Sequence, residues 1–422
     1  MNTNIIRAGD LRLNPSMLTA IERYAELAVS VGINVQPGQT LVIQASIYNA
    51  DFVRLIARKA YEAGAKNVHV EWDDDELKRM KYKMAPDEAF DEFPAWKAQG
   101  YTDMASNDAA FLTVYSPAPD LLQGVKPERL AAASKAYGTA MRPYRAMMQA
   151  GQISWAIVSA PSPAWARKVF PDAEGEEAER LLWDHLLQAA RAYEADPLEA
   201  WRLHLGRLRS HVERMNGKRY TRLIYRSPGT ELTVDLPADH QWVAGGVHNA
   251  KGTFFVPNIP TEELFTLPHR DSANGTVSST KPLNWNGQVI DKFTLTFKDG
   301  VVTSCTAETG LEALQRLIAT DAGAARLGEV ALVPQDSPIA NMNVLFYNTG
   351  LDENASCHLA LGNAYPLCIE GGSSMSREEL DARGANSSVA HVDFMIGTDQ
   401  LDIDGVLPDG SVEPIFRQGN WA

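Results

Sequence analysis

The spacing of apolar residues predicts that the chain begins with alternating helices and strands. Apolar positions recur at helical spacing over residues 18–31, and this predicted helix ends at Gly32. A short buried strand is predicted for residues 40–45, an amphipathic helix for 50–65 and a second strand for 67–72. Because a strand, a helix and a strand in close succession form a βαβ unit, we predict a mostly parallel sheet here.

Strand patterns become dominant after about residue 219. The sequence Lys298-Asp-Gly300 separates two of these strands, and Asp-Gly is typical of a β-hairpin turn. We therefore predict an α/β N-terminal domain, residues 1–218, and a β-rich α+β C-terminal domain, residues 219–422. The strands predicted for the second domain include residues 222–226, 231–235, 292–297 and 301–306.

Composition and charge narrow the classes of function. The 422 residues are 45% hydrophobic and carry a net charge of −14, which argues against a nucleic-acid partner and against a polybasic membrane contact. The N-terminus has no apolar signal segment, and no apolar run reaches about 18 residues, the length of a membrane span. Three cysteines are too few for a disulfide framework. We therefore expect a cytoplasmic protein that binds neither membranes nor nucleic acid.

Residues 352–366 combine several kinds of reactive side chain. The pattern predicts a helix that its closing proline ends. His358 and Tyr365 are seven residues apart, two helical turns, and would lie on one face. Glu353 lies off this face unless it forms a cap with Asp352 ahead of the helix. The stretch thus offers a carboxylate, an imidazole and a phenol.

Two predicted strands carry further candidate ligands. His391 and Asp393 open the apolar strand 391–397, where alternate residues share a face, although a simple ion pair at a strand end is an equal alternative. Glu329 opens the apolar strand 329–334, and the alternative there is a solvated side chain.

A third acidic position follows Pro260, where Thr261, Glu262 and Glu263 could also be an ordinary helix start. Oxygen and nitrogen donors with more carboxylates than imidazoles suit two divalent cations, and zinc, cobalt or manganese fits such a set. Two adjacent cations need a bridging carboxylate, and the lack of sulfur donors indicates a catalytic site. The candidate ligands are Glu263, Glu329, Glu353, His358, His391 and Asp393.

The sequence resembles the thermophilic-type metallo-aminopeptidases, the family of aminopeptidase T, aminopeptidase S and aminopeptidase II. The resemblance runs essentially end to end and rests on many motifs in order. They include Val35-Gln-Pro-Gly-Gln-Thr-Leu-Val42, Asn258-Ile-Pro-Thr-Glu-Glu263, Gly328-Glu-Val-Ala-Leu-Val333, Asp352-Glu-Asn-Ala-Ser-Cys-His-Leu-Ala360, His391-Val-Asp-Phe-Met-Ile396 and Pro414-Ile-Phe-Arg-Gln-Gly-Asn-Trp421.

The resemblance implies a metal-dependent aminopeptidase that removes N-terminal residues from short peptides through a water activated by two metal ions. It places the metal ligands of the family on the six residues above and the catalytic tyrosine on Tyr365. Glu263 or Glu329 is the candidate for the proton transfer, and we assign this role to Glu263. The resemblance also implies a homodimer with the site in an internal cavity.

The sequence also allows two alternative functions. The chain could be a dinuclear deacylase of N-acyl amino acids, or a peptide- or metal-binding protein without turnover. Cys357 is either a nucleophile or, more simply, a small buried residue on the back of the predicted helix. His269 and Arg270 could bind a substrate carboxylate or form a structural ion pair.

Overall fold

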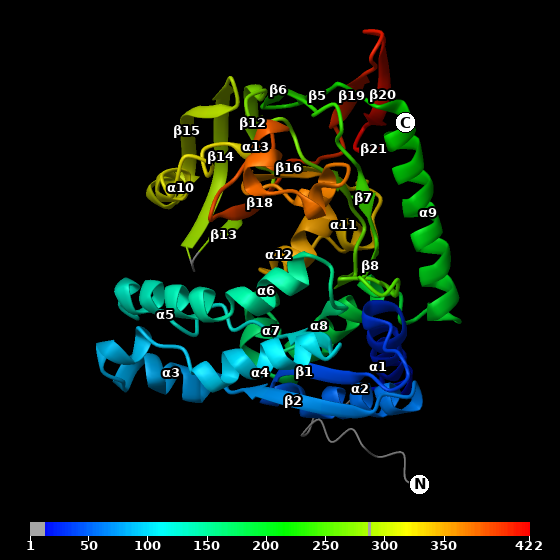
Figure 1. Ribbon diagram of the computed structural model, residues 1–422, viewed down its shortest axis with the longest axis vertical. Coiled ribbons are helices and arrows are strands. Elements are labelled where there is room, and N and C mark those ends of the chain that lie inside the picture. Colours follow the sequence, from blue (N-terminus) through cyan, green and yellow to red (C-terminus); the bar gives the residue numbers. More distant parts are fainter. Residues whose placement is uncertain (1–12, 286–287) are drawn as a thin grey trace. The chain divides into compact units, whose positions relative to one another are not determined.

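The computed structural model describes residues 13–285 and 288–422, which form two compact units. The first unit contains residues 13–203 and Gly246–Pro260, and the second contains His204–Gly245 and the described residues of Thr261–Ala422 (Figure 1). No helix among the described residues is both long and apolar enough to cross a membrane. The domain boundary near residue 218 remains a prediction.

A five-stranded parallel sheet forms the centre of the first unit. Its strands lie in the order β10-β4-β3-β1-β2. The predicted βαβ unit is confirmed, since β1 and β2 pair in parallel and α2 connects them. The strands are β1 (Thr40–Ser46), β2 (Asn67–Asp73), β3 (Ala110–Tyr115), β4 (Trp155–Ser159) and β10 (Asn258–Ile259).

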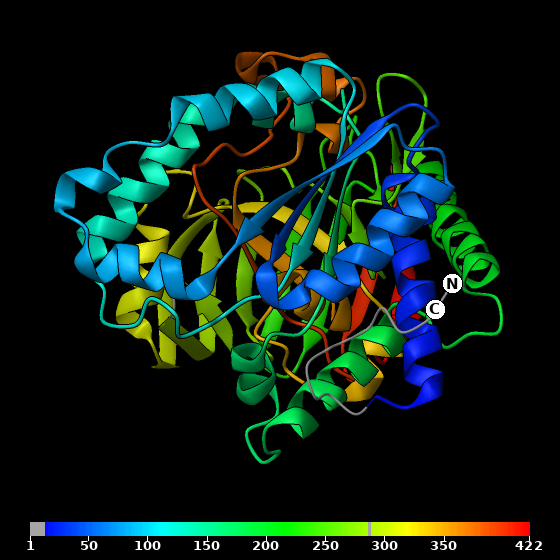
Figure 2. The same ribbon diagram turned by 90° about the horizontal axis from the view of Figure 1, so that it is seen from below.

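Helices cover both faces of this sheet (Figure 2). Tyr101 and Tyr144, from two helices, pack with Val42 and Phe111 on one face. The helix α9 (Pro197–Lys218) begins in this unit and continues into the second unit. A short strand pair, β8 (Val247–His248) with β9 (Phe254–Phe255), also belongs to the first unit. The other helices of this unit are α1 (Pro15–Leu27), α2 (Ala50–Glu62), α3 (Asp75–Met84), α4 (Ala95–Ser106), α5 (Pro127–Ala140), α6 (Arg142–Gln149), α7 (Pro163–Val169) and α8 (Glu176–Ala189).

The second unit is built on two antiparallel sheets. The smaller sheet has the order β18-β17-β16-β11-β7, and the larger has the order β13-β14-β12-β6-β5-β19-β20-β21, with β15 paired to β14. The smaller sheet comprises β7 (Val243–Ala244), β11 (Leu264–Thr266), β16 (Leu327–Leu332), β17 (His358–Gly362) and β18 (His391–Met395). The larger comprises β5 (Arg222–Ser227), β6 (Thr230–Asp235), β12 (Asn274–Ser278), β13 (Leu283–Trp285), β14 (Gln288–Lys298), β15 (Val301–Thr309), β19 (Asp402–Val406), β20 (Val412–Arg417) and β21 (Asn420–Trp421).

A common apolar core joins these two sheets. Phe293 of the larger sheet packs against Phe394 of the smaller one, with ring centroids 5.5 Å apart. Leu359 and Val330 contribute to the same core. One face of the smaller sheet therefore packs into the core, and the other face can carry polar side chains. The short helices of this unit are α10 (Leu311–Ile318), α11 (Pro338–Met342), α12 (Thr349–Asp352) and α13 (Arg377–Ala382).

The predicted helix over residues 352–366 is wrong. The helix α12 ends at Asp352, a single 3₁₀ turn follows at Glu353–Ala355, and the chain then forms strand β17. A short buried strand presents a continuous apolar run, which periodicity alone does not distinguish from a buried helix segment. Cys357 therefore does not lie on the back of a helix.

The alternative of a helix start after Pro260 is also wrong. Glu262 and Glu263 lead directly into strand β11. An acidic pair after threonine is a common helix signal, but pairing with β16 and β7 decides the local structure here.

Candidate metal centre

Three adjacent strands present four of the predicted ligands on one face of the smaller sheet. Glu329 lies on β16, His358 on β17, and His391 and Asp393 on β18. Their neighbours along each strand point to the apolar core on the opposite face, because successive side chains alternate. The strand pairing therefore brings together four donors whose positions in the sequence span 64 residues, from 329 to 393.

Ala360 lies at the middle of this polar face. It is paired with Glu329 on one side and with Asp393 on the other. Paired residues on neighbouring strands have Cβ atoms roughly 4.5–5.5 Å apart. A methyl group at this position leaves space between the two carboxylates.

The remaining two candidate ligands come from segments outside these strands. Glu263 immediately precedes β11, and Glu353 lies in the turn after α12. Asn354 connects the two segments, since its Oδ1 accepts a hydrogen bond of 2.7 Å from the Glu262 backbone N–H. Its Nδ2 also donates to the Gly350 carbonyl. This buried amide thus holds the segment carrying Glu263 against the turn carrying Glu353.

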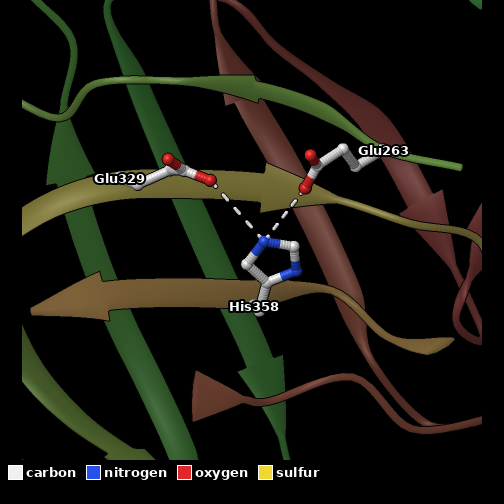
Figure 3. Close-up of side chains that lie close together, drawn as sticks. All are labelled: Glu263, Glu329 and His358. Carbon is white, nitrogen blue, oxygen red and sulfur yellow. Dashed lines mark ion pairs between the residues drawn. The ribbon is translucent and has the colours of Figure 1, made fainter. Parts of the chain in front are cut away.

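The two oxygens of Glu329 face two different histidines. Oε1 lies 3.6 Å from His358 Nε2, and Oε2 lies 3.6 Å from His391 Nε2. Glu263 Oε2 lies 3.2 Å from the same His358 nitrogen, and Figure 3 shows this carboxylate and Glu329 on either side of the ring. Asp393 Oδ1 lies 3.4 Å from His391 Nε2. Glu329 is therefore the central carboxylate of the cluster.

Three overlapping groups of donors can be distinguished within the cluster. In each group, the donor atoms lie within 4.8 Å of one another. The groups are Glu263, Glu329 and His358; Glu329, His391 and Asp393; and Glu353, His358 and Asp393.

Backbone carbonyls determine which nitrogen of each histidine faces the cluster. His391 Nδ1 lies 2.7 Å from the Asn363 carbonyl oxygen, and His358 Nδ1 lies 3.1 Å from the Ser356 carbonyl oxygen. A carbonyl oxygen only accepts hydrogen bonds, so in the neutral ring Nδ1 carries the proton. Both Nε2 atoms thereby face the carboxylates, and in the neutral ring each would offer its lone pair to an ion held between them, which is the arrangement that metal-binding histidines use.

The electrostatics of the cluster show an excess of buried negative charge. Burial raises the pKa of Glu329 to about 7 and that of Glu353 well above its ordinary value. Burial alone would lower the pKa of His391, but the neighbouring Asp393 carboxylate raises it to about 9. The pKa of His358 is likewise raised by its carboxylate neighbours in spite of burial. The cluster therefore favours the binding of positive charge.

The residues present fit divalent metal ions. Among the described residues, Glu263 Oε2, His358 Nε2 and Asp393 Oδ1 are buried and have no hydrogen-bond partner. Buried polar atoms are costly unless a partner satisfies them. Carboxylate and imidazole donors that converge in this way are the ligands of zinc, cobalt and manganese sites.

Tyr365 lies beside the cluster, but for another reason than helical spacing. It follows strand β17, and its ring contacts His391, with centroids 4.8 Å apart, and Phe265, at 6.0 Å. Its side chain is 40% exposed. Desolvation and the negative charges of Glu329 and Asp393 raise the pKa of Tyr365, so its hydroxyl stays protonated at neutral pH.

Cys357 is separated from this chemistry. Its thiol donates to the Val333 carbonyl oxygen at 3.3 Å and belongs to the apolar core. Burial raises the pKa of Cys357 to about 11, which keeps the thiol protonated. The simpler interpretation of Cys357, a small buried residue, fits this environment.

Sequence reasoning missed the residues that support the ligands. Asn354 and the carbonyls of Ser356 and Asn363 have no distinctive sequence signal. The sequence predicts Asp352 only as a cap, whereas its carboxylate accepts hydrogen bonds from the backbone N–H groups of Phe346 and Asn348 at 2.7 and 3.0 Å. Its position next to Glu353 was the only signal available.

Comparison with known proteins identifies the family. The family model for the thermophilic metalloproteases (M29) matches residues 18–421. The chain belongs to this family. It is 53% identical to aminopeptidase 2 of Geobacillus stearothermophilus over 95% of this chain and 97% of that protein. It is 52% identical to aminopeptidase AmpS of Bacillus subtilis (strain 168) over 95% of this chain and 98% of that protein.

A solved structure supports the same assignment. Wild-type AmpT from Thermus thermophilus superposes with a TM-score of 0.91 at 40% identity, covering 96% of this chain and 99% of that one. The predicted fold class is confirmed. The predicted family and enzyme class, a metallo-aminopeptidase acting on peptide bonds, are confirmed as well. Family membership implies a divalent metal, and the buried donor groups described above are ones that could hold it.

Proposed function

We propose that this enzyme removes N-terminal residues from short peptides with the help of two divalent cations held by the six clustered side chains. The observation that carries the proposal is the position of Glu329, whose two oxygens face two separate histidines. A carboxylate in this position could be shared by two cations, one held beside each histidine. We assign the cations to zinc, cobalt or manganese from the donor types.

The overlapping donor groups suggest how the ligands divide. One cation would be held by Glu263, Glu329 and His358, and the other by Glu329, His391 and Asp393. Glu353 lies near members of both sets. When bound, such cations lower the pKa of a coordinated water and polarise the scissile carbonyl.

Two side chains of the chain itself are assigned catalytic roles. The protonated hydroxyl of Tyr365 donates a hydrogen bond to the oxygen that becomes negatively charged as the carbonyl is attacked. Glu263 accepts the proton of the attacking water and passes it to the leaving amine. Its Oε2 is the oxygen nearest His358, which leaves Oε1 for this transfer.

The donors of the cluster support cleavage at a free N-terminus. Two divalent cations would balance the charge of the four carboxylates, so the α-amino group of a peptide would be held by short-range contact, either with a cation as a neutral amine or with one of these carboxylates as an ammonium group. The amide nitrogen of an N-acylated amino acid makes neither contact, so this argument disfavours the deacylase alternative. Assembly into a homodimer and a cytoplasmic location remain predictions.

The test is hydrolysis of an aminoacyl-p-nitroanilide and of its N-acetylated analogue, each with and without a chelator. We expect chelator-sensitive hydrolysis of the free-amine substrate and at least a hundredfold slower hydrolysis of the acetylated one. Faster hydrolysis of the acetylated substrate would favour the deacylase, and hydrolysis that survives metal removal would refute the proposed role of the metal.

A further inference from the structure

The six proposed ligands are held in two different ways. Glu329, His391 and Asp393 lie on strands β16 and β18, which pair with β17 on either side. Glu263 and Glu353 lie outside the strand pairs that the structure describes, in the segment before β11 and in the turn after α12. In the proposed division, the first cation site comprises Glu263, Glu329 and His358, and the second comprises Glu329, His391 and Asp393.

The two proposed sites offer the same types of donor. Each has two carboxylates and one imidazole, so donor chemistry alone would give them similar affinities. They differ in how the donors are held, because the first site takes Glu263 from outside the strand pairs. Since donors that are fixed in advance need less reorganisation, we expect the second site to bind its cation more tightly.

Asn354 is a buried residue whose side chain contacts the segment of Glu263 and which itself follows Glu353 in the chain. Its Oδ1 accepts a hydrogen bond of 2.7 Å from the backbone N–H of Glu262, and its Nδ2 donates to the Gly350 carbonyl oxygen at 3.0 Å. The side chain is fully buried, so both bonds are made away from bulk water, where a missing partner is costly.

The backbone of Asn354 is anchored as well. Ser337 Oγ donates to its carbonyl oxygen at 3.1 Å and accepts from the Ala340 backbone N–H at 3.0 Å, which caps helix α11. Ser337 is also buried. The turn that carries Glu353 is therefore fixed to α11 as well as to the segment of Glu263.

A second buried side chain holds the segment of Glu263 at its start. The Thr261 carbonyl oxygen lies 2.8 Å from His204 Nε2 of helix α9, and since a carbonyl oxygen only accepts, this nitrogen donates. Both residues belong to the second unit. His204 thus fixes where the segment begins, and Asn354 fixes its position relative to the turn of Glu353.

We infer that Asn354 is a positioning residue that sets the affinity of the first cation site and has little effect on the second. This inference rests on the proposed function and adds to it a difference between the two sites. Without the Asn354 amide, the segment of Glu263 is free to move away from the turn, and the first site loses one of its three donors. The donors of the second site all lie on paired strands and keep their positions.

This role is tested by titrating the metal-free protein with zinc chloride in a calorimeter, with a competing chelator present. The unmodified protein should bind two ions in two steps of different affinity. Glu263→Gln should weaken or abolish the weaker step, which assigns that step to the first site. In Asn354→Ala, the same step should weaken about 10- to 100-fold, the usual effect of losing a residue that orients a metal ligand, and the tighter step should stay nearly unchanged.

Asn216→Ala is the matched control. Asn216 also belongs to the second unit, and its amide accepts from the Trp242 backbone N–H at 2.8 Å and donates to the Trp242 carbonyl oxygen at 3.0 Å. This variant therefore loses the same two kinds of hydrogen bond outside the donor groups. It should keep both binding steps nearly unchanged.

The outcomes separate this inference from the proposed function. An unchanged weaker step in Asn354→Ala would overturn the role of Asn354, and so would an equal weakening of both steps or the same weakening in Asn216→Ala. If Asn354→Ala does not fold, Ser337→Ala takes its place, because it removes only the bond to the Asn354 carbonyl and the cap of α11. It should weaken the same step alone, and an unchanged step would again overturn the role. If the unmodified protein binds one ion or none, it is the proposed function that fails.

Discussion

At the scale of single residues, the contacts of Glu329 connect the two histidines of the proposed metal centre. Its side chain is 6% exposed and faces His358 and His391 with separate oxygens. Each histidine is fixed in turn by a backbone carbonyl that accepts from Nδ1. These contacts hold the donor atoms in position before any ion binds, so ion binding requires little reorganisation of the side chains.

Replacing Tyr365 by Phe should lower kcat and leave metal content unchanged. The variant removes one hydrogen-bond donor to the developing oxyanion, and a loss of this kind costs about 10²–10³ in kcat. Steady-state kinetics and metal analysis on the same preparation check this expectation. Tyr137→Phe, which alters a half-exposed ring in the first unit, is the control and should be unaffected. A Tyr365→Phe enzyme that loses metal but keeps its rate per bound ion would contradict the catalytic role.

At the scale of elements, strand β17 determines the geometry of the site. It lies between β16 and β18, and it brings His358 and Ala360 onto the same face as Glu329 and Asp393. Gly362 allows the close approach of β18, because a Cβ there would lie 2.2 Å from the Ala390 carbonyl oxygen. The φ of Gly362, 107°, is also one that other residues rarely adopt.

This element shows how far the sequence could predict the site. Residue types and the family resemblance selected the six donors that the structure brings together, and alternation predicted that His391 and Asp393 share a face. The helix over residues 352–366 was wrong because sheet pairing overrides an apolar pattern that local spacing leaves ambiguous. The contact of Tyr365 with His391, rather than with His358 along a helix, could not be predicted because it depends on that pairing.

Enlarging Ala360 to Leu should displace the cations without unfolding the protein. The larger side chain would occupy the space between Glu329 and Asp393, and overpacking of this size costs about 1–3 kcal/mol. We expect loss of at least one bound cation per chain, measured by metal analysis, with a nearly unchanged circular dichroism spectrum. Ala360→Gly keeps the space and should keep the metal. A fully metal-loaded Ala360→Leu protein would show that the ions lie elsewhere.

At the scale of the whole molecule, the chain combines a parallel α/β unit with a unit of two antiparallel sheets, and the entire donor cluster belongs to the second. The second unit includes the C-terminal strands β19, β20 and β21. Asp404 of β19 links these strands to β5. The carboxylate of Asp404 accepts from Arg226 at 2.7 Å and from Arg417 at 2.5 Å. Burial alone would raise the pKa of Asp404, but the two arginines outweigh it and lower the pKa.

Asp404→Asn should therefore destabilise the protein in a pH-dependent way. A lowered pKa in the folded state means that the ionised carboxylate stabilises the fold above the ordinary aspartate pKa of about 3.9, and that this contribution is lost as the pH falls through the folded-state value. We expect the free energy of unfolding to drop by about 1 kcal/mol at pH 7, because both arginines are partly exposed. The difference from the unmodified protein should shrink below about pH 4.

Urea unfolding at several pH values measures this difference. Asp399→Asn changes an exposed aspartate without an ion pair among the described residues and serves as the control. The ionised Asp404 carboxylate would not be stabilising if the loss in free energy of unfolding caused by Asp404→Asn grew as the pH fell.

The central claim is that one carboxylate, Glu329, joins two cation sites in the second unit. Metal analysis of the purified, metal-loaded protein and of Glu329→Gln tests it most directly, with Glu231→Gln of strand β6 as a control outside the cluster. The account predicts two divalent cations per chain in the unmodified protein and in the control, and fewer than one in Glu329→Gln. A single cation in the unmodified protein, or two retained in Glu329→Gln, would contradict it.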